Sequence, residues 1–268
     1  MGLNQISVYG LLHLSLERWR RHEQWRVAAK LDLHRRPTVL YGPFSGLQFP
    51  SGIDVRNNLP KIIGSYECEL NSIIEELISR RFPLVVNVGC AEGYYAIGLA
   101  MRNAQSSVFA FDIDPEQQER CRRMARLNGV DGRVQVSGKC DAATLVRLKL
   151  EDALVLMDCE GAELEILAEE VVPSLLRTHL LIELHDAVRP GCSRTLWQRF
   201  SRTHEMVFIA ASARDPGQYP ILQRLSPRKR HIAVHEDRLG VQEWVFMRPL
   251  PSKPASAASW QTRGKASA

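Results

Sequence analysis

The feature that most constrains the fold of this sequence is a regular alternation of short apolar runs with longer amphipathic stretches. Runs of strand length lie between residues 84 and 184, at Leu84–Val88, Ser107–Phe111, Arg133–Val136, Ala153–Met157 and Leu180–Leu184. Stretches with helical spacing separate them, at Tyr94–Arg102, Pro115–Asn128, Ala142–Lys149 and Ala162–Leu176, the last broken at Pro173. Buried strands joined by helices form parallel sheets covered on both faces, so we predict a doubly wound α/β fold.

Further elements are predicted on either side of this alternation. Apolar side chains near helical spacing over residues 11–30 indicate an amphipathic helix, and Asn71 is a candidate cap for a helix that ends at Arg80. A helix at Ser193–Thr203 precedes two apolar runs, Met206–Ala211 and Glu243–Met247. No helical pattern clearly separates these two runs, so we expect them to pair as an antiparallel hairpin at one sheet edge.

The positive charge is concentrated at the ends of the chain. The net charge of the 268 residues is +5, whereas residues 1–40 alone hold seven Lys or Arg against three Asp or Glu. Residues 251–268 hold three Lys or Arg, no acid, and the small polar residues typical of disorder. We therefore predict a basic N-terminal helical extension (1–40), one α/β domain (41–250) and a disordered tail (251–268). The basic segment Ser226–His231 is interpreted as a solvated loop.

Cysteine usage and hydropathy indicate a cytoplasmic protein. The six cysteines are scattered and form no CxxC pair, which favours free thiols in a reducing compartment over a disulfide frame or a zinc site. No apolar run reaches the roughly 18 residues that a membrane-spanning helix requires. The sequence does not predict the oligomeric state.

The first apolar run ends in a glycine turn, Gly89-Cys-Ala-Glu-Gly93, and an apolar helical pattern resumes at once. In a doubly wound sheet, ligands bind beyond the carboxyl ends of the strands, where this turn lies. A side chain at position 89 or 93 is expected to obstruct such a ligand. The second strand ends 23 residues later at Asp112, whose carboxylate can bind the two hydroxyls of a ribose. This pair predicts an adenosine-type cofactor.

The composition of the turn favours S-adenosylmethionine over a dinucleotide. The second glycine of the GxGxxG fingerprint is missing, and Glu92 is expected to bring negative charge towards a pyrophosphate. S-adenosylmethionine carries no phosphate, and its sulfonium is cationic, so it tolerates carboxylates nearby. An NAD-dependent oxidoreductase remains the alternative on the turn alone.

Four segments together resemble the FkbM-type class I S-adenosylmethionine-dependent methyltransferases. They are "VVNVGCAEGYYAIGLA", "VFAFDIDP", "LVLMDCEGAELEIL" and "LLIELHD", and the likeness spans about residues 66–186. It implies a Rossmann-like sheet of seven strands with an antiparallel edge hairpin, and methyl transfer to an oxygen. Residues 41–250 would then be the methyltransferase domain.

The resemblance also implies a cofactor site. Gly89 and Gly93 would form the cofactor turn, Asp112 would bind the ribose, and Asp141 would lie near the adenine. The family usually has an aspartate where this chain has Asn87, which removes a charge near the donor's ammonium group. The full set of cofactor-binding candidates is Asn87, Gly89, Cys90, Glu92, Gly93, Asp112, Ile113, Asp141, Asp158 and Glu67.

Acidic residues and one histidine at the ends of the fourth and fifth runs are the catalytic candidates. His185 is the candidate general base because its unperturbed pKa lies near neutrality, and Asp158 and Glu183 are candidates to orient the acceptor or to assist the base. Asp158, His185 and Asp186 are also possible ligand types for a divalent ion, but no local ligand spacing supports that site, so we predict none. The helix dipole accounts for Glu160 and Glu163 at a helix start.

The acceptor is expected to be a small-molecule or sugar hydroxyl. The Asn/Asp-Pro-Pro-aromatic turn that accompanies methylation of amines on bases is replaced here by Asp158-Cys-Glu-Gly161, which argues against a nucleic-acid substrate. Two further alternatives remain open. One is a nucleic-acid methyltransferase that recruits its substrate through the basic ends, and the other is a binding module that kept the fold and lost activity.

Overall fold

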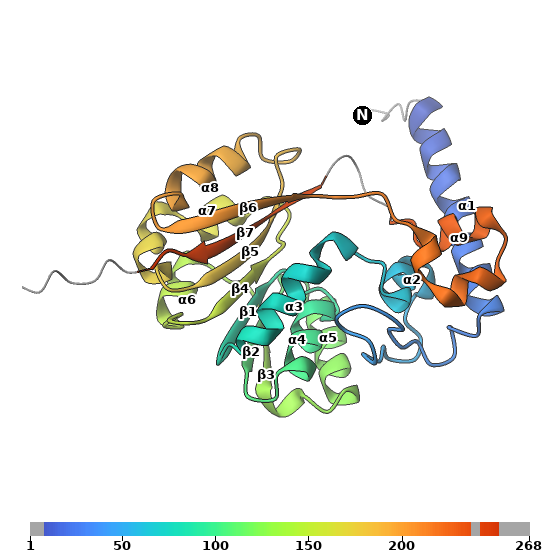
Figure 1. Cartoon of the computed structure of the whole chain (residues 1–268), viewed down its shortest axis with the longest axis horizontal. Helices are drawn as coiled ribbons and strands as arrows, with labels where there is room; N and C mark the ends of the chain where they lie inside the picture. Colours follow the sequence, from blue (N-terminus) through green and yellow to red (C-terminus); the bar gives the residue numbers. More distant parts are fainter. Residues whose placement is uncertain (1–7, 237–241, 252–268) are drawn as a thin grey trace, which may run out of the picture.

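Seven strands form a single mixed sheet in a computed structural model that describes residues 8–236 and 242–251 (Figure 1). The strand order is β3-β2-β1-β4-β5-β7-β6, and β1 to β5 are parallel. β7 is antiparallel to both of its neighbours. The strands are β1 (Leu84–Val88), β2 (Ser107–Phe111), β3 (Val134–Ser137), β4 (Leu154–Met157), β5 (His179–Leu184), β6 (His204–Ala210) and β7 (Glu243–Pro249). The predicted doubly wound sheet and its antiparallel edge hairpin are confirmed.

Helices cover both faces of the sheet and create two apolar layers. The helices are α1 (Val8–Lys30), α2 (Val55–Ile63), α3 (Asn71–Arg80), α4 (Tyr94–Arg102), α5 (Pro115–Leu127), α6 (Ala142–Arg147), α7 (Glu163–Ile166), α8 (Cys192–Phe200) and α9 (Pro227–Ala233). One buried layer combines side chains of α3, α4 and α5 with alternate strand residues, and the other combines side chains of α6, α7 and α8 with the remaining ones. This arrangement explains the uninterrupted apolar runs, because strands buried on both faces need no polar side.

The N-terminal helix α1 packs on the domain through its second half. Val27 and Ala28 are fully buried in the first apolar layer, and α1 contacts α2 and α9 (Figure 1). The side chain of Gln24 donates hydrogen bonds to the backbone carbonyls of Ile232 and His235. These contacts tie the start of the chain to the segment between β6 and β7. The boundaries near residues 40 and 250 stay predictions, and residues 252–268 of the expected tail lie outside the described residues.

Four local predictions are corrected by the structure. The basic segment Ser226–His231, interpreted as a loop, lies mostly in α9, where Pro227 takes the first helical position that suits proline. Two 3-10 turns, η4 (Pro216–Gln218) and η5 (Pro220–Arg224), precede it, so helical structure does separate the hairpin strands. The helix expected over residues 162–176 is split into α7 and a 3-10 helix, η3 (Glu169–Leu175), which contains Pro173. Asn71 begins α3 instead of capping it.

The structure also describes the state of the cysteines and the length and polarity of the helices. All six cysteines are free thiols. In residues 8–236 and 242–251, no helix combines the length and the apolar character that crossing a bilayer requires.

His179 in β5 should make the stability of the fold depend on pH. Burial, followed by the positive charge of Arg80, lowers the pKa of His179 from 6.5 to about 4. The ring lies against Phe82 and Phe246, and its Nδ1 atom has no hydrogen-bond partner among the described residues. Because the unfolded chain binds a proton below about pH 6.5 and the folded chain does not, stability is lost as the pH falls towards 4.

We expect this histidine to cost about 1 kcal/mol of stability between pH 7.5 and pH 5, after allowance for partial exposure. His179→Leu should remove that part of the pH dependence, because leucine has no charged form. Urea unfolding of both proteins at the two pH values measures the difference. Equal pH dependence in the two proteins would contradict the assignment to His179.

Candidate active site

The glycine turn between β1 and α4 is closed on itself by hydrogen bonds. The backbone N–H groups of Gly89 and Cys90 both donate to the carbonyl of Phe111 at the end of β2, each at 2.9 Å. The N–H of Ala91 donates to the Asp112 carboxylate at 2.8 Å, and the N–H of Gly93 donates to the Cys90 carbonyl at 2.8 Å. These backbone N–H groups therefore donate to acceptors within the protein, and one of them fixes the Asp112 carboxylate beside the turn.

Both glycines of the turn are required by the protein's own packing. At Gly89, where φ is +76°, a Cβ would overlap the backbone carbonyl of Asp158 after β4. At Gly93, where φ is +102°, it would press on the side chains of Cys121 and Ile97. Gly89 thus lets the ends of β1 and β4 approach, and Gly93 lets α4 start against α5. The expected obstruction of a ligand by a side chain at these positions stays a prediction.

A cavity of about 340 Å³ opens beyond the carboxyl ends of β1, β2 and β4. Five of the predicted cofactor residues line it: Gly89, Asp112, Ile113, Asp141 and Asp158. The exposed fraction of Ile113 is 81%, which is unusual for a large apolar side chain and leaves it free to cover a flat ligand. Sequence reasoning missed the apolar lining residues, which include Phe111, Cys140 and Ile166.

The other five predicted cofactor residues lie outside the lining of this cavity. Cys90 is buried against Cys121, and Glu92 forms an ion pair with Lys61 of α2 at 2.5 Å. Glu67 is buried, and its carboxylate accepts a hydrogen bond from the Tyr95 hydroxyl. Gly93 packs as described above. Asn87 is buried within β1, and its Oδ1 atom has no hydrogen-bond partner among the described residues.

Asp141 lies at the rim of the cavity and has a structural task there. Its carboxylate accepts hydrogen bonds from the backbone N–H of Thr144 at 2.8 Å and from the Thr144 hydroxyl at 2.6 Å, so it caps α6. These hydrogen bonds hold the pKa of Asp141 below its usual value. The contact of Asp141 with an adenine remains a prediction. The hydrogen bonds of the helix cap already fix the orientation of the Asp141 side chain.

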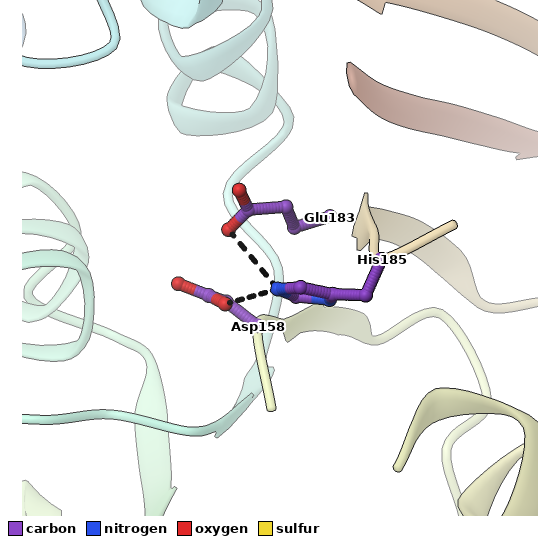
Figure 2. Close-up of side chains that lie close together, drawn as sticks. All are labelled: Asp158, Glu183 and His185. Atoms are coloured by element: carbon purple, nitrogen blue, oxygen red, sulfur yellow. Dashed lines mark ion pairs between the residues drawn. The ribbon is translucent and has the colours of Figure 1, made fainter. Parts of the chain in front are cut away.

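The three predicted catalytic residues meet at the ends of β4 and β5. Figure 2 shows His185 pointing its Nε2 atom between the carboxylates of Asp158 and Glu183, at distances of 3.6 and 4.0 Å. The Glu160 carboxylate lies 3.6 Å from the same atom. The side chains of His185 and Glu183 are buried, whereas Asp158 is partly exposed and Glu160 is exposed. Sequence reasoning predicted this group, because the ends of parallel strands meet at one edge.

Glu163 was assigned only to the helix dipole, but the structure places it in this group. Its side chain is fully buried, and its Oε1 atom lies 2.8 Å from Nδ1 of His185. The same oxygen accepts hydrogen bonds from the backbone N–H groups of Cys159 and Gly161, at 3.2 and 3.3 Å. Glu163 therefore holds both the loop that carries Asp158 and the ring of His185. The sequence pattern does not reveal that a glutamate at the start of this helix is fully buried.

The carboxylates control the protonation of His185. Burial alone would lower the pKa of His185, but the close contact with Glu163 and the charges of Glu163, Asp158 and Glu160 raise it above 6.5. The pKa of Glu163 is lowered: burial opposes this shift, and the contact with His185 outweighs the burial. Glu163 and His185 thus stabilise each other's charged forms.

Asp186, considered as a metal ligand type, belongs to a different part of the structure. Its carboxylate accepts hydrogen bonds from the backbone N–H groups of Gly191 and Ser193, both at 3.1 Å, and from the Ser193 hydroxyl. It therefore anchors the start of α8 and does not join His185. Alternation of side chains along an extended chain is consistent with this separation of Asp186 from Glu183 and His185.

A second cavity of about 330 Å³ meets the first at Asp158 and Glu160, which line both. Its other walls come from α1, α2 and the segment between β6 and β7, including Gln24, Asn57, Tyr66 and Gln242. Almost every lining side chain carries a hydrogen-bonding group. Two cavities that share an acidic junction suit a reaction in which a group passes from one bound molecule to another.

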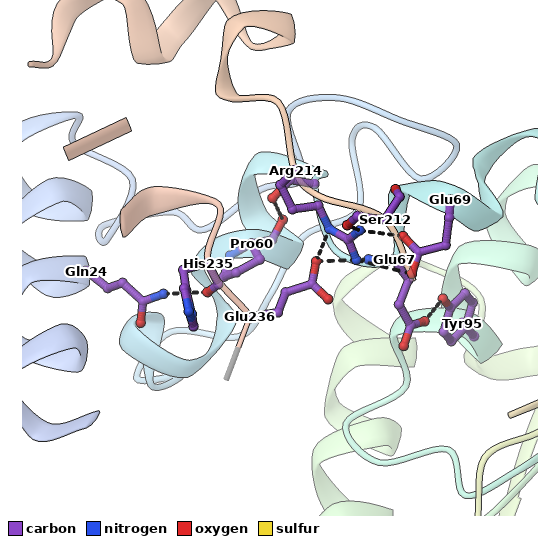
Figure 3. Close-up of polar contacts among 10 residues, drawn as sticks. Gln24, Pro60, Glu67, Glu69, Tyr95, Ser212, Arg214, His235 and Glu236 are labelled. Atoms are coloured by element: carbon purple, nitrogen blue, oxygen red, sulfur yellow. Dashed lines mark hydrogen bonds and ion pairs between the residues drawn. The ribbon is translucent and has the colours of Figure 1, made fainter. Parts of the chain in front are cut away.

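Buried ion pairs fix the wall of the second cavity. Figure 3 shows the Arg214 guanidinium between Glu69 and Glu236, with ion pairs of 2.6 Å to each. All three side chains are nearly buried. This cluster ties the segment after β6 to the turn η1 (Cys68–Leu70), and Gln24 holds His235 on the other side. Trp244, which follows this segment, is fully buried in β7.

Comparisons with known proteins find similarity to solved structures alone. No protein-family model matches the chain, and no curated protein matches its sequence. A methyltransferase from Geobacter sulfurreducens is 17% identical with a TM-score of 0.42, and the match covers 69% of this chain and 78% of that one. The O-methyltransferase TomG from Streptomyces achromogenes, solved in complex with SAM, is 10% identical with a TM-score of 0.46, covering 66% and 77%.

A third match is the SAH-bound methyltransferase PaMTH1 from Podospora anserina, which is 15% identical with a TM-score of 0.43 and covers 68% of this chain and 77% of its own. These likenesses concern the arrangement of the sheet and its helices, at identities too low to speak for substrate or mechanism. The sheet of seven strands with an antiparallel edge hairpin agrees with what the sequence resemblance implied.

Proposed function

We propose that this chain is an S-adenosylmethionine-dependent methyltransferase of the FkbM type that acts on a hydroxyl of a small molecule or sugar. One observation carries the proposal. The turn at Gly89–Ala91 and the carboxylate of Asp112 line the same cavity, and the N–H groups of the turn already donate within the protein. The cavity therefore offers a ribose a carboxylate but offers a pyrophosphate few free donors.

The described residues fit S-adenosylmethionine in both charge and shape. Asp112 would hold the ribose hydroxyls, Ile113 and Phe111 would flank the adenine, and Asp158 would face the cationic end. Asn87 would lie beneath that end, since its partner across the strands, Leu156, precedes Asp158 by two residues. A carboxylate near a sulfonium lowers the energy of the bound cation in a partly buried cavity.

The junction of the two cavities is where an acceptor hydroxyl would lie. Bound S-adenosylmethionine would supply an electrophilic methyl carbon: the acceptor oxygen would bond to it, the carbon–sulfur electron pair would return to sulfur, and the hydroxyl proton would leave. Asp158 would orient the hydroxyl, and His185, once deprotonated, would accept the hydroxyl proton. Glu163 fixes the ring through Nδ1, which leaves Nε2 to act.

The dinucleotide alternative is weakened by the turn, although not for the reason expected from the sequence. Glu92 was expected to repel a pyrophosphate, but it points away and pairs with Lys61. The internal hydrogen bonds of the Gly89, Cys90 and Ala91 N–H groups provide the argument instead, since dinucleotide turns present such donors to phosphate. Mixing the protein with NADH should give no enhancement of NADH fluorescence.

Asp112→Asn should weaken binding of S-adenosylhomocysteine by about 10- to 100-fold, because an amide offers one acceptor oxygen where the carboxylate offers two charged ones. Asp114→Asn is the matched control. Asp114 lies two residues away and caps α5, a task that asparagine performs equally well. Calorimetric titration of both variants measures the effect. Equal affinities would remove Asp112 from the cofactor site.

The proposal is tested by incubating the protein with isotope-labelled S-adenosylmethionine and a metabolite extract, followed by mass analysis. We expect label in a small molecule that carries a hydroxyl. Label in RNA or DNA would instead support the nucleic-acid alternative, and cofactor binding without any labelled product would support the inactive binding module.

A further inference from the structure

His185 lies beside Asp158 and Glu160, the two residues that line both cavities, and its Nε2 atom is surrounded by carboxylates. Nε2 of His185 lies 3.6 Å from Asp158, 3.6 Å from Glu160 and 4.0 Å from Glu183. None of these distances is that of a hydrogen bond, which would bring nitrogen and oxygen to about 2.7–2.9 Å for a charged pair. Three carboxylates thus pair with one nitrogen at distances longer than a hydrogen bond.

The distances from Nε2 to Asp158 and to Glu183, 3.6 and 4.0 Å, fall within the range of two atoms that share a cation. Ligand atoms about 2.1 Å from one ion lie about 3.0 Å apart at a right angle and up to about 4.2 Å apart on opposite sides. One oxygen of Asp158, one of Glu183 and a nitrogen of His185 lie within 4.8 Å of one another. The widest gap shortens when a carboxylate turns inwards. Figure 2 shows the three side chains pointing into a common space.

The Nδ1 atom of His185, on the other side of the ring from Nε2, has the carboxylate partner that is common among metal-binding histidines. Metal-ligating histidines commonly donate their other ring N–H to a carboxylate, which fixes the ring and its tautomer. Here Nδ1 lies 2.8 Å from the fully buried carboxylate of Glu163. The proton is thereby held at Nδ1, and the lone pair of Nε2 faces Asp158 and Glu183.

Two buried atoms at this place have only distant charged partners. The ring of His185 is 8% exposed, and its Nε2 atom forms ion pairs of 3.6, 3.6 and 4.0 Å, all longer than a hydrogen bond. The Oδ1 atom of Asp158 is inaccessible to solvent and has no hydrogen-bond partner among the described residues. A cation between these two atoms would satisfy both and would offset the mutual repulsion of the acids.

We propose that Asp158, Glu183 and His185 bind a divalent transition-metal ion at the junction of the cofactor and acceptor cavities. The nitrogen ligand favours such an ion over Mg²⁺ or Ca²⁺, which prefer all-oxygen sites. The open side of the site faces the acceptor cavity, which Asp158 and Glu183 line. The role of the ion in the reaction rests on the proposed function, whereas the binding of the ion can be tested independently of that function.

The ion would change the task of His185 in the proposed reaction. A coordinated nitrogen cannot take a proton, whereas a hydroxyl bound to the ion has a lowered pKa and loses its proton more readily. That proton would pass to solvent or to the exposed carboxylate of Glu160 beside the site. The hydroxyl oxygen would then be fixed at the junction between the two cavities.

Titration with Mn²⁺ tests the site without any need for the acceptor. The paramagnetic resonance signal of free Mn²⁺ should fall until one ion is bound per chain, and Glu183→Gln should weaken the affinity at least about 10-fold, because it removes a charged ligand. Glu170→Gln is the matched control, since Glu170 is exposed and remote from the cluster, and it should bind like the wild type. Asp158→Asn serves as a second ligand variant should Glu183→Gln fail to fold.

The outcomes separate the two proposals. Loss of Mn²⁺ binding in a folded ligand variant, with the control unaffected, supports the site. Absence of binding to the wild type up to about 1 mM Mn²⁺, or equal affinity in the ligand variants, overturns it. Titration with S-adenosylhomocysteine in the absence of metal is run alongside. Binding of S-adenosylhomocysteine without binding of Mn²⁺ refutes the metal site and leaves the proposed methyltransferase function standing. Binding of Mn²⁺ without binding of S-adenosylhomocysteine refutes the methyltransferase function alone.

Discussion

Gly89→Ala is expected to lower the free energy of unfolding by at least about 4 kcal/mol and to abolish binding of S-adenosylhomocysteine. The added Cβ would overlap the carbonyl of Asp158, a backbone atom that cannot rotate away. The ends of β1 and β4 would have to separate, and the floor of the cofactor cavity would be lost. The backbone angle adds a further cost, since φ is +76°.

Gly129→Ala separates steric overlap from backbone strain. Gly129 also has a positive φ, +65°, but its Cβ would meet nothing within 4 Å. Only the strain remains, so the expected loss is about 1 kcal/mol with cofactor binding unchanged. Urea unfolding and calorimetry of both variants give the comparison. Similar losses in the two would show that the contact between β1 and β4 does not explain the glycine.

His185→Gln should reduce methyl transfer at least about 100-fold and change the affinity for S-adenosylhomocysteine by less than about threefold. Glutamine can still offer an amide N–H to the buried carboxylate of Glu163, which limits the damage to folding. It cannot accept the acceptor's proton. The prediction also holds if the histidine binds an ion, because an amide is the poorer ligand.

His231→Gln is the control for this experiment, because His231 is exposed in α9 and lines neither cavity. Transfer of labelled methyl to the extract and cofactor affinity are measured for both variants. If His185→Gln transferred methyl at the wild-type rate, His185 would be neither the base nor a required ligand. A parallel loss of transfer and of cofactor affinity would place its role in binding.

The fold was predictable because burial on both faces leaves a strong pattern. Leu84–Val88 and Ser107–Phe111 were predicted at their observed bounds, since every residue of such a strand can be apolar. The segment from Ser226 to Ala233 was not, because a short basic helix with few buried side chains lacks clear periodicity. Its helical form depends on packing against α1, which the sequence does not reveal.

The site was predictable where it depends on strand ends, and unpredictable where it depends on side-chain direction. Asp112, Asp158 and His185 were found because parallel strands bring their ends together. Glu92 and Cys90 lie in the same turn, yet they point to α2 and α5, a choice that the turn's hydrogen bonds determine. Glu163 was undervalued because a glutamate in a first helical turn is common, and only its complete burial beside His185 shows its task.

The central claim is that the cavity between the 89–93 turn and Asp112 holds an adenosine attached to a sulfur amino acid. Calorimetric titration of the unmodified protein with S-adenosylhomocysteine, beside an equal titration with NADH, tests it most directly. Saturable binding of one S-adenosylhomocysteine per chain and no binding of NADH is the predicted result. Absence of heat with S-adenosylhomocysteine up to about 1 mM, or saturable binding of NADH alone, would contradict it.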